Sequence, residues 1–561
     1  MEEARIGVFV CHCGTNIGGY LDVPTLVEYA RSLPNVAFSM DNLYTCSEVG
    51  LEEIRKAIRE HGLTRVVVAS CTPRTHEPLF RSTCEEAGLN PYLFEFVNIR
   101  EQCSWVHMDD KERATNKAKD LIKLGVAKAR LLEPEEEIEV EVHPSAVVIG
   151  GGIAGMTCSL SLANRGFQVK LVEKEEQLGG LLRRLYKVYP TGEDASRIFE
   201  AKIREIEGNP RVEVLTSSEV EDIGGFIGNY DLRVRSGEGE RSLKAGVIVV
   251  AIGAEVFSPK GLYNYDGKRV LTQLELEQRL RDRTLDADVV VMIQCVGARD
   301  EERTYCSRVC CMTAVQNAML IKEANPNAEV FMLYRDMQTY GTKYEDFYRK
   351  ARDAGVVFIE FLKDRKPIVE DGVVKVFDQF LGEELTLPYD LVVLSTPMIP
   401  QPDAKDLAKM LKVPLSEDGF FLEAHVKLRP VDFATDGIYL CGSAHWPSDI
   451  GESISQAYAA ASRASIPLSK GRVKTEPLVS VVDEEKCIGC GLCESVCPFK
   501  AIRVEQTEKG RVARTVVASC KGCGVCGAGC PVKAIGMRHF TDGQLLAQID
   551  SLVEVKAIGS T

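Results

Sequence analysis

The chain has 561 residues, a formal net charge of -14 and 20 cysteines. Because single hydrophobic cores stop growing at about 250–300 residues, this length predicts several domains. The negative charge argues against nucleic acid as a partner, since phosphate contacts need clustered Lys and Arg.

The N-terminal stretch carries acids rather than a basic patch before a short apolar segment, so no secretory leader is expected. No apolar run approaches the ~18 residues needed to span a bilayer. We therefore expect a cytoplasmic protein without direct membrane insertion. Its cysteines are then reduced, which favours metal ligation over a disulfide framework.

The first segment, residues 1–132, alternates short apolar runs with amphipathic stretches, which predicts a small α/β domain. Strands are expected at 5–10, 65–70 and 92–97, and helices at 23–33 and 51–63. A long amphipathic helix over 109–132 is expected to close the domain. The acidic, proline-flanked stretch 133–145 indicates a linker.

Residues 146–475 repeat a pattern of strand, glycine turn, helix and strand. An apolar strand runs directly into a Gly-x-Gly-x-x-Gly turn that begins at Gly150, and Glu173 ends the next strand. Such glycines let the chain approach a pyrophosphate at a helix N-terminus, and the acid accepts from the ribose hydroxyl. The alternative is a structural nucleotide-binding domain that has lost its ligand. The candidate cofactor-binding residues are Gly150, Gly152, Ile153, Ala154, Gly155, Glu173, Lys174, Gly179, Gly180, Gly253, Gly442 and Ser443.

Three later features agree with this turn: the glycines at 179–180, the strand 247–254 and the stretch 435–444. Together they resemble the FAD domain of two-dinucleotide-domain disulfide reductases, of which thioredoxin reductase is one. The resemblance implies FAD and a second dinucleotide domain inserted at about 262–395. In that family the late motif ends Gly-Asp, whereas this chain has Gly442-Ser443, so a serine hydroxyl stands where the acid holds the ribityl chain.

The expected strand 287–293 lacks the glycine-rich turn that a nicotinamide cofactor needs. Four cysteines follow it instead, at the end of a strand and the start of a helix, where open α/β sheets bind ligands. We expect a [4Fe-4S] cluster there in place of NAD(P), so that single electrons rather than hydride reach the flavin. A redox disulfide or buried thiols are the alternative. The candidate ligands are Cys295, Cys306, Cys310 and Cys311.

The segment 476–561 contains two half repeats with the spacing C-x2-C-x2-C-x3-C-P. This is the bacterial ferredoxin run, in which the fourth cysteine ligates the other cluster, so two [4Fe-4S] clusters are expected. Zinc is the alternative, but zinc ribbons use two separated CxxC pairs. One predicted ligand set is Cys487, Cys490, Cys493 and Cys530. The other is Cys520, Cys523, Cys526 and Cys497.

Six stretches of the chain resemble the A-type subunit of heterodisulfide reductase, which contains flavin and iron-sulfur clusters. They are "VFVCHCGTNIGG", "VVASCTPRTHEPLF", "GLNPYLFEFVNIREQCSWVHMD", "VVIGGGIAGM", "YCSRVCCM" and the duplicated ferredoxin run. The resemblance implies one more cluster in the N-terminal domain, and thus FAD with about four [4Fe-4S] clusters. Five cysteines compete as its ligands, of which Cys11 and Cys71 end strands and face one crevice. The candidates are Cys11, Cys13, Cys46, Cys71 and Cys103.

The same resemblance implies an oxidoreductase subunit whose catalytic centre is the flavin ring rather than a protein residue. Electrons would arrive from a hydrogenase, a formate dehydrogenase or another donor through a small adaptor. They would leave through an iron-sulfur subunit to a thiol-disulfide catalytic subunit, and some family members bifurcate them at FAD. The family also implies a dimer within a larger complex.

Two departures from the family bear on bifurcation. The chain lacks an additional ferredoxin insert before the strand at 247, and it has Gln316 where bifurcating members tend to have a lysine. A cation there would favour anionic reduced flavin, and Lys343 is a candidate to supply that charge instead. Simple electron transfer without bifurcation is therefore an alternative. Two other classes are an NAD(P)H oxidoreductase similar to the glutamate synthase small subunit, which needs a second glycine turn, and a cluster-based scaffold or redox sensor.

Overall fold

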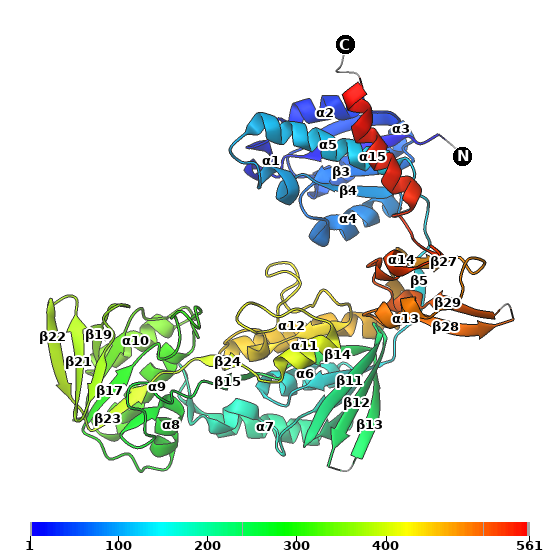
Figure 1. Cartoon of the computed structure of the whole chain (residues 1–561). Helices are drawn as coiled ribbons and strands as arrows, with labels where there is room; N and C mark the ends of the chain where they lie inside the picture. Colours follow the sequence, from blue (N-terminus) through cyan, green and yellow to red (C-terminus); the bar gives the residue numbers. More distant parts are fainter. Residues whose placement is uncertain (1–2, 238, 509, 558–561) are drawn as a thin grey trace. The chain divides into compact units, whose positions relative to one another are not determined.

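The computed structural model describes residues 3–237, 239–508 and 510–557 (Figure 1). The chain divides into two compact units. Unit 1 contains Met1–Val140 and Lys474–Thr561, and unit 2 contains Glu141–Val473. The segments expected as separate N-terminal and ferredoxin domains thus belong to one unit. No helix in the described part of the chain is long and apolar enough to cross a membrane.

The N-terminal part of unit 1 is a parallel sheet in the order β2-β1-β3-β4, flanked by helices. Its strands are β1 (Ile6–Cys11), β2 (Val36–Asn42), β3 (Arg65–Ser70) and β4 (Phe94–Asn98). Its helices are α1 (Thr15–Gly18), α2 (Val23–Arg31), α3 (Glu48–His61), α4 (Pro73–Glu86) and α5 (Lys111–Ala129). Three helices begin where a polar side chain accepts a first-turn N–H, at Asp22, Ser47 and Asp110. The expected strands and helices are present, and β2 is an additional strand.

The C-terminal part of unit 1 reflects the half repeats of the sequence. Two short helices, α13 (Leu492–Val496) and α14 (Val525–Gly529), occupy equivalent places in the repeats. Its strands form two antiparallel pairs, β27 (Ser480–Val482) with β30 (Ile535–Met537) and β28 (Ile502–Thr507) with β29 (Gly510–Thr515).

The last helix, α15 (Asp542–Ala557), packs along α5 (Figure 1). The amides of Gln544 and Gln548 donate to the carbonyl oxygens of Leu131 and Leu124, at 2.9 and 3.3 Å. Leu131 lies just beyond the C-terminal end of α5, and the two hydrogen bonds join α15 to this end of the helix. They help to explain why the two ends of the chain share one unit.

The first half of unit 2, residues 141–256 and 398–473, contains a parallel sheet in the order β10-β7-β6-β14-β25. Its strands are β6 (Ser145–Ile149), β7 (Gln168–Val172), β10 (Val212–Leu215), β14 (Val247–Val250) and β25 (Ile438–Leu440). Helices α6 (Ile153–Asn164) and α12 (Ile450–Lys470) pack against each other. A meander of β11 (Ser218–Phe226), β12 (Asn229–Ser236) and β13 (Gly239–Ala245) adds the β-rich interruption. Strands such as β6 and β14 are buried throughout, as parallel strands covered on both faces require.

The second half of unit 2, residues 257–397, is inserted between β15 (Ala254–Val256) and β24 (Met398–Pro400), which pair with each other. Its parallel sheet has the order β16-β23-β17-β18-β19. The strands are β16 (Val270–Thr272), β17 (Val289–Ile293), β18 (Glu329–Tyr334), β19 (Val357–Glu360) and β23 (Leu391–Leu394). Helices α8 (Gln273–Arg281), α9 (Cys310–Ala324) and α10 (Tyr344–Asp353) accompany them. The bounds of this insertion lie close to residues 262–395, where the sequence predicts a second dinucleotide domain.

Candidate cofactor sites

The glycines of the turn after β6 serve two purposes: close packing of the backbone and open space for a ligand. Gly150 has φ 108°, and a Cβ added there would lie 2.3 Å from the carbonyl oxygen of Ala251. A Cβ on Gly155 would lie 1.8 Å from the carbonyl oxygen of Gly150, so this glycine allows α6 to pack against the strand end. Around Gly152, in contrast, a Cβ would meet no described atom within 4 Å. Gly152 therefore borders open space at the N-terminus of α6, where a phosphate binds in this motif.

Glu173, at the end of the next strand, is buried and turned toward this glycine turn. Its Oε2 accepts the N–H of Gly151 at 2.5 Å, and its Oε1 accepts the N–H of Glu175 at 2.9 Å. The carboxylate thus fixes the turn and remains on the wall of a cavity. Lys174 also lines that cavity, and its Nζ donates to Oε1 of Gln401 at 3.0 Å.

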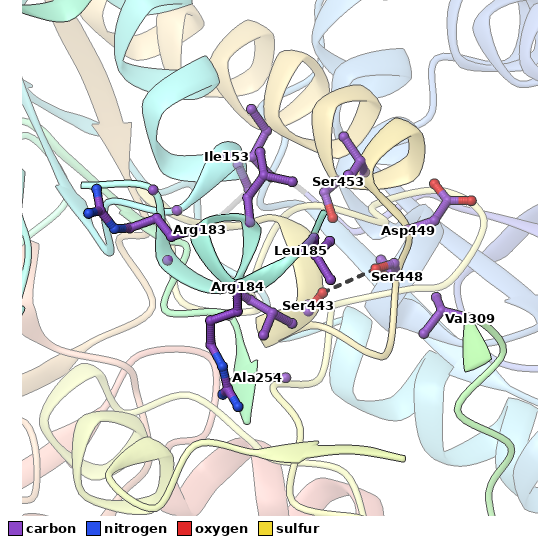
Figure 2. Close-up of a pocket in the computed structure, with 18 of the residues that line it drawn as sticks. Ile153, Arg183, Arg184, Leu185, Ala254, Val309, Ser443, Ser448, Asp449 and Ser453 are labelled. Atoms are coloured by element: carbon purple, nitrogen blue, oxygen red, sulfur yellow. Dashed lines mark hydrogen bonds between the residues drawn. The ribbon is translucent and has the colours of Figure 1, made fainter. Parts of the chain in front are cut away.

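The cavity has a volume of about 1120 Å³ and is lined by both halves of unit 2 (Figure 2). This volume slightly exceeds the range of about 300–1,000 Å³ for small-molecule sites and suits a dinucleotide. The predicted residues on its wall are Gly150, Gly152, Ile153, Ala154, Glu173, Lys174, Gly179, Gly180, Gly253 and Ser443.

The late motif reaches the cavity as expected. Gly442 has φ 72° and packs against Ala154, because a Cβ there would lie 2.7 Å from the Ala154 Cβ. Ser443 lies on the wall, and its hydroxyl donates to the carbonyl oxygen of Ser448 at 3.4 Å, the dashed contact in Figure 2. Asp449 follows it there as the N-cap of α12 and accepts the hydroxyl of Tyr344 at 2.5 Å.

Helices α8 and α9 of the second half contribute the opposite wall. Gln316 is 5% exposed, and its Oε1 has no hydrogen-bond partner among the residues that the structure describes. A buried amide oxygen without a partner is unfavourable unless a ligand supplies a donor. The cavity therefore fits FAD at both ends, with open space at the glycine turn and an unsatisfied polar atom at the far wall. Lys343 is exposed and does not line the cavity, whereas its neighbour Tyr344 does.

Sequence reasoning did not find Glu277, Tyr344 or Asp449, which also line the cavity. None belongs to a spacing motif. Glu277 is an acid within an amphipathic helix, a position that usually faces solvent, and only the packing of α8 shows that it is buried.

The four cysteines of the second half gather at the C-terminal end of β17. Cys295 follows the strand with φ 60°, and Cys310 and Cys311 begin α9. Burial, together with the negative charges of Cys311 and Cys306, raises the pKa of Cys295 to about 11, so the thiols are neighbours. Cys310 donates to the sulfur of Cys311, which raises the pKa of Cys310 and lowers that of Cys311.

The N-terminal cysteines separate into four neighbours and one outlier. The sulfur of Cys11 accepts the N–H of Cys13 at 3.3 Å. Burial raises the pKa of Cys46 and of Cys71, and the charges of Cys11 and Cys13 raise both further. The guanidinium of Arg100 donates to the Cys13 sulfur at 3.4 Å and lowers the pKa of its neighbours Cys46 and Cys71.

Cys103 is the outlier. It is fully buried in the core between the sheet and α5, and its thiol donates to the carbonyl oxygen of Ala114 at 3.1 Å. Burial raises its pKa to about 11, and the other group that acts on it is Lys117 rather than a thiol. Cys84, similarly, lies in the core with a pKa raised to about 12 by burial.

The ferredoxin cysteines divide between two small cavities in the pairing that the repeat predicts. The first cavity is lined by Cys487, Cys490, Cys493 and Cys530. The second is lined by Cys497, Cys520, Cys523 and Cys526. Backbone N–H groups of Ala513, Ala501 and Ala534 donate to the sulfurs of Cys487, Cys497 and Cys530 at 3.4, 3.3 and 3.2 Å. Such donors stabilise negative charge on cluster-bound sulfur.

Across residues 3–237, 239–508 and 510–557, no three His, Cys, Asp or Glu side chains converge on a point where one metal ion could bind. A four-iron cluster makes a different demand, because its four cysteines each bind a different iron around a larger body.

Family models match two regions of the chain. A pyridine nucleotide-disulphide oxidoreductase model matches residues 144–464, and a 4Fe-4S dicluster domain model matches residues 480–537. The first match confirms the predicted flavoprotein fold class, and the second confirms the C-terminal iron-sulfur domain.

Two similar proteins come from methanogens. The A-type subunit of the H(2):CoB-CoM heterodisulfide,ferredoxin reductase of Methanothermobacter thermautotrophicus is 39% identical over 655 aligned positions, covering 99% of this chain and 98% of the relative. An A-type iron-sulfur subunit of the CoB–CoM heterodisulfide reductase of Methanopyrus kandleri is 40% identical over 98% of both. Because 655 positions exceed the 561 residues here, the Methanothermobacter protein has residues that this chain lacks. Thioredoxin reductase of Lactococcus lactis covers 58% of this chain and 99% of its own, at 17% identity and a TM-score of 0.43.

Proposed function

The chain belongs to the family of A-type heterodisulfide reductase subunits, and from this premise we propose that it is the electron-transfer hub of a heterodisulfide-reductase-like complex. It is an oxidoreductase subunit with a flavoprotein domain and an iron-sulfur domain. In the proposal, two-electron chemistry at FAD is divided into single-electron transfers between a donor module and a thiol-disulfide reductase module.

One observation carries this function. The four thiols at 295–311 lie at the strand end where a nicotinamide loop would be, in the half of unit 2 whose α9 also lines the cavity of the glycine turn. When bound there, FAD supplies a centre that takes up or releases two electrons. The chain's part is to bind the phosphates beside Gly152, to fix the turn through Glu173 and to face the ring with Gln316.

We assign the clusters to four sets of thiolates. Two are the ferredoxin sets already described. The third is Cys295, Cys306, Cys310 and Cys311. For the fourth, the surroundings of the five N-terminal candidates favour Cys11, Cys13, Cys46 and Cys71, with Cys103 as a buried structural thiol.

The donor and acceptor modules are proposed from the names of relatives. The relative from Methanococcus maripaludis is named for H(2) and formate, and that from Methanosarcina acetivorans for ferredoxin and F(420)H(2). Since the named donors differ while this subunit is shared, we propose that an adaptor module brings the donor. Dimerisation within the complex is part of the same proposal.

Electron bifurcation at FAD is a second candidate function. The name of the Methanothermobacter relative, which includes ferredoxin, favours it. Gln316 and the shorter chain favour transfer along a single route, because a neutral amide favours anionic reduced flavin less than a lysine does.

Iron per FAD in anaerobically purified protein tests the proposal. About 16 irons per FAD correspond to four clusters. About eight would restrict clusters to the ferredoxin region and make 295–311 a redox-thiol site. A matched pair of variants tests the N-terminal set: Cys46→Ala should lose about four irons per FAD, and Cys103→Ala should lose none.

A further inference from the structure

Glu277 is a buried carboxyl that reaches the cavity from helix α8. It is 2% exposed, yet it lines the same cavity as Gln316. Its Oε2 accepts the N–H of Tyr186 at 2.6 Å, and the side chain of Asn317 on α9 also donates to it. The carboxyl thus joins three elements around the far wall: α8, α9 and the chain after Gly179–Gly180.

Two other acids on the cavity wall, Glu173 and Asp449, stabilise the local backbone. Glu173 accepts two backbone N–H groups that hold the glycine turn. Asp449 caps α12 and accepts the hydroxyl of Tyr344. Glu277 accepts a backbone N–H from another segment, that of Tyr186, but it neither caps a helix nor holds a turn. A carboxyl this deeply buried is unfavourable in its charged form, which together with its place on the cavity wall points to a chemical role.

Burial raises the pKa of Glu277 to about 7, while the N–H of Tyr186, the amide of Asn317 and the charge of Arg281 act in the opposite direction. Near neutral pH the carboxyl is therefore present in both its protonated and its charged form. Other ionisable side chains that line the same cavity include Tyr189, Tyr344 and Lys187. Burial holds the pKa of Tyr189 and Tyr344 above the ordinary value, and Lys187 is paired with Asp194 at 3.1 Å.

A flavin that receives electrons from clusters rather than from a nicotinamide needs a separate proton donor. Hydride from a nicotinamide carries a proton together with two electrons, whereas iron-sulfur clusters deliver electrons alone. Reduction of oxidised FAD to its anionic reduced form takes two electrons and one proton. A chain that receives bare electrons must obtain that proton from a group on the protein or from water.

We propose, on the premise that FAD occupies this cavity, that the Glu277 carboxyl is its proton donor and acceptor. During reduction, two electrons enter from the iron-sulfur clusters, and Glu277 gives up the proton of its carboxyl. It is left as a carboxylate. During oxidation the same carboxylate receives the proton back. Electrons and protons balance without any further reactant.

Glu277→Gln is the decisive variant, because glutamine keeps the shape and can still accept the N–H of Tyr186. The midpoint potential of the flavin in the anaerobic holoprotein is measured by spectroelectrochemistry from pH 5.5 to pH 9. We expect an inflection near pH 7 in the natural protein, its loss in Glu277→Gln and its return in Glu277→Asp. General acid catalysis is worth about 10²-fold or more, so flavin reduction should slow by at least tenfold in Glu277→Gln.

Asp282→Asn is the matched control, because Asp282 is an exposed acid at the end of the same helix. It should leave the inflection in place. If the natural protein binds no FAD, the proposed function itself is wrong. If FAD is bound and reduced but the pH profile of Glu277→Gln overlays that of the natural protein, the role of Glu277 alone is overturned.

Discussion

Each half of unit 2 contains its own parallel five-stranded sheet. The two halves differ at the end of one strand, which is β6 in the first half and β17 in the second. After β6, the helix α6 begins directly beyond the glycines, with open space at Gly152. After β17, the loop 294–309 intervenes before α9, and Cys295 and Cys310 lie at its two ends. The crevice at the strand ends is the same ligand-binding place in both halves. The residues of the loop decide which ligand it takes.

The helix N-terminus favours negative charge in both crevices, but the charge differs. At α6 backbone N–H groups and the helix dipole suit a pyrophosphate. At α9 the same dipole would stabilise the negative charge of a cluster ligated through Cys310 and Cys311, the two first residues of the helix. In the proposed function, one electrostatic feature of the fold therefore serves a nucleotide in one half and a cluster in the other.

Removing a thiol from the second crevice should have the largest effect. Cys310→Ala is expected to lose about four irons per FAD while FAD content stays at one per chain, because the thiols form a site of their own beyond the glycine turn. Metal analysis and flavin absorbance measure both quantities. Equal loss of FAD and iron would contradict the separation of the two crevices.

Substitutions in the first crevice should remove FAD and leave iron. Gly152→Ala places a methyl group into open space, so the apoprotein should keep its melting temperature while FAD binds about 10- to 100-fold more weakly, or about 1.4–2.8 kcal/mol. Gly155→Ala should lose FAD and also lower the melting temperature, since its methyl group would overlap the Gly150 carbonyl. Tight FAD binding by Gly152→Ala would show that the phosphates lie elsewhere.

The stability of the apoprotein should depend on pH because Glu277, in the second half of unit 2, is buried. The pKa of Glu277 rises from 4.5 to about 7 on folding, so the folded chain keeps a proton that the unfolded chain releases between these values. The free energy of unfolding therefore decreases by about 3 kcal/mol as the pH rises from 4.5 to 7, at 1.36 kcal/mol per pKa unit. Glu277→Gln should remove this loss, so its melting temperature should exceed that of the natural apoprotein at pH 8 but not at pH 4.5. If the melting temperatures of Glu277→Gln and the natural apoprotein differ by the same amount at pH 4.5 and at pH 8, Glu277 lies in a solvated environment.

The smallest expected effect concerns the wall that α9 presents to the cavity. Gln316→Lys introduces a cation that should stabilise the anionic reduced flavin by about 1.4 kcal/mol, a tenfold change. Gln316→Met has similar length without charge and serves as the control. The flavin midpoint potential checks the difference, and an unchanged potential in Gln316→Lys would mean that this side chain does not face the ring.

The site residues that could be predicted from the sequence belong to motifs with a recurring spacing. The two ferredoxin sets, the glycine turn and Glu173 could be named from the sequence, because recurring spacings identify them. Three cysteines of each set lie a few positions apart in one loop, and the duplicated run assigns the fourth. The four cysteines of the second half could be placed because a strand end and a helix start are visible in the hydrophobic pattern.

Other parts needed the folded chain. Cys103 has the same residue type as its four competitors, and only the packing of its thiol against Ala114 separates it from them. Glu277 lies within a helix whose pattern does not reveal that this face is buried. The sharing of unit 1 by both ends of the chain depends on α15 packing against α5.

The sequence by itself determined the family and the fold class, and it predicted the ligand sets from recurring spacings, since local spacing fixes local geometry. The tertiary structure decided which thiol stands apart, which acid is desolvated beside the cavity and which distant segments form one unit. Those properties arise from contacts between residues far apart in the chain, where burial and neighbouring charges are set by packing rather than by pattern.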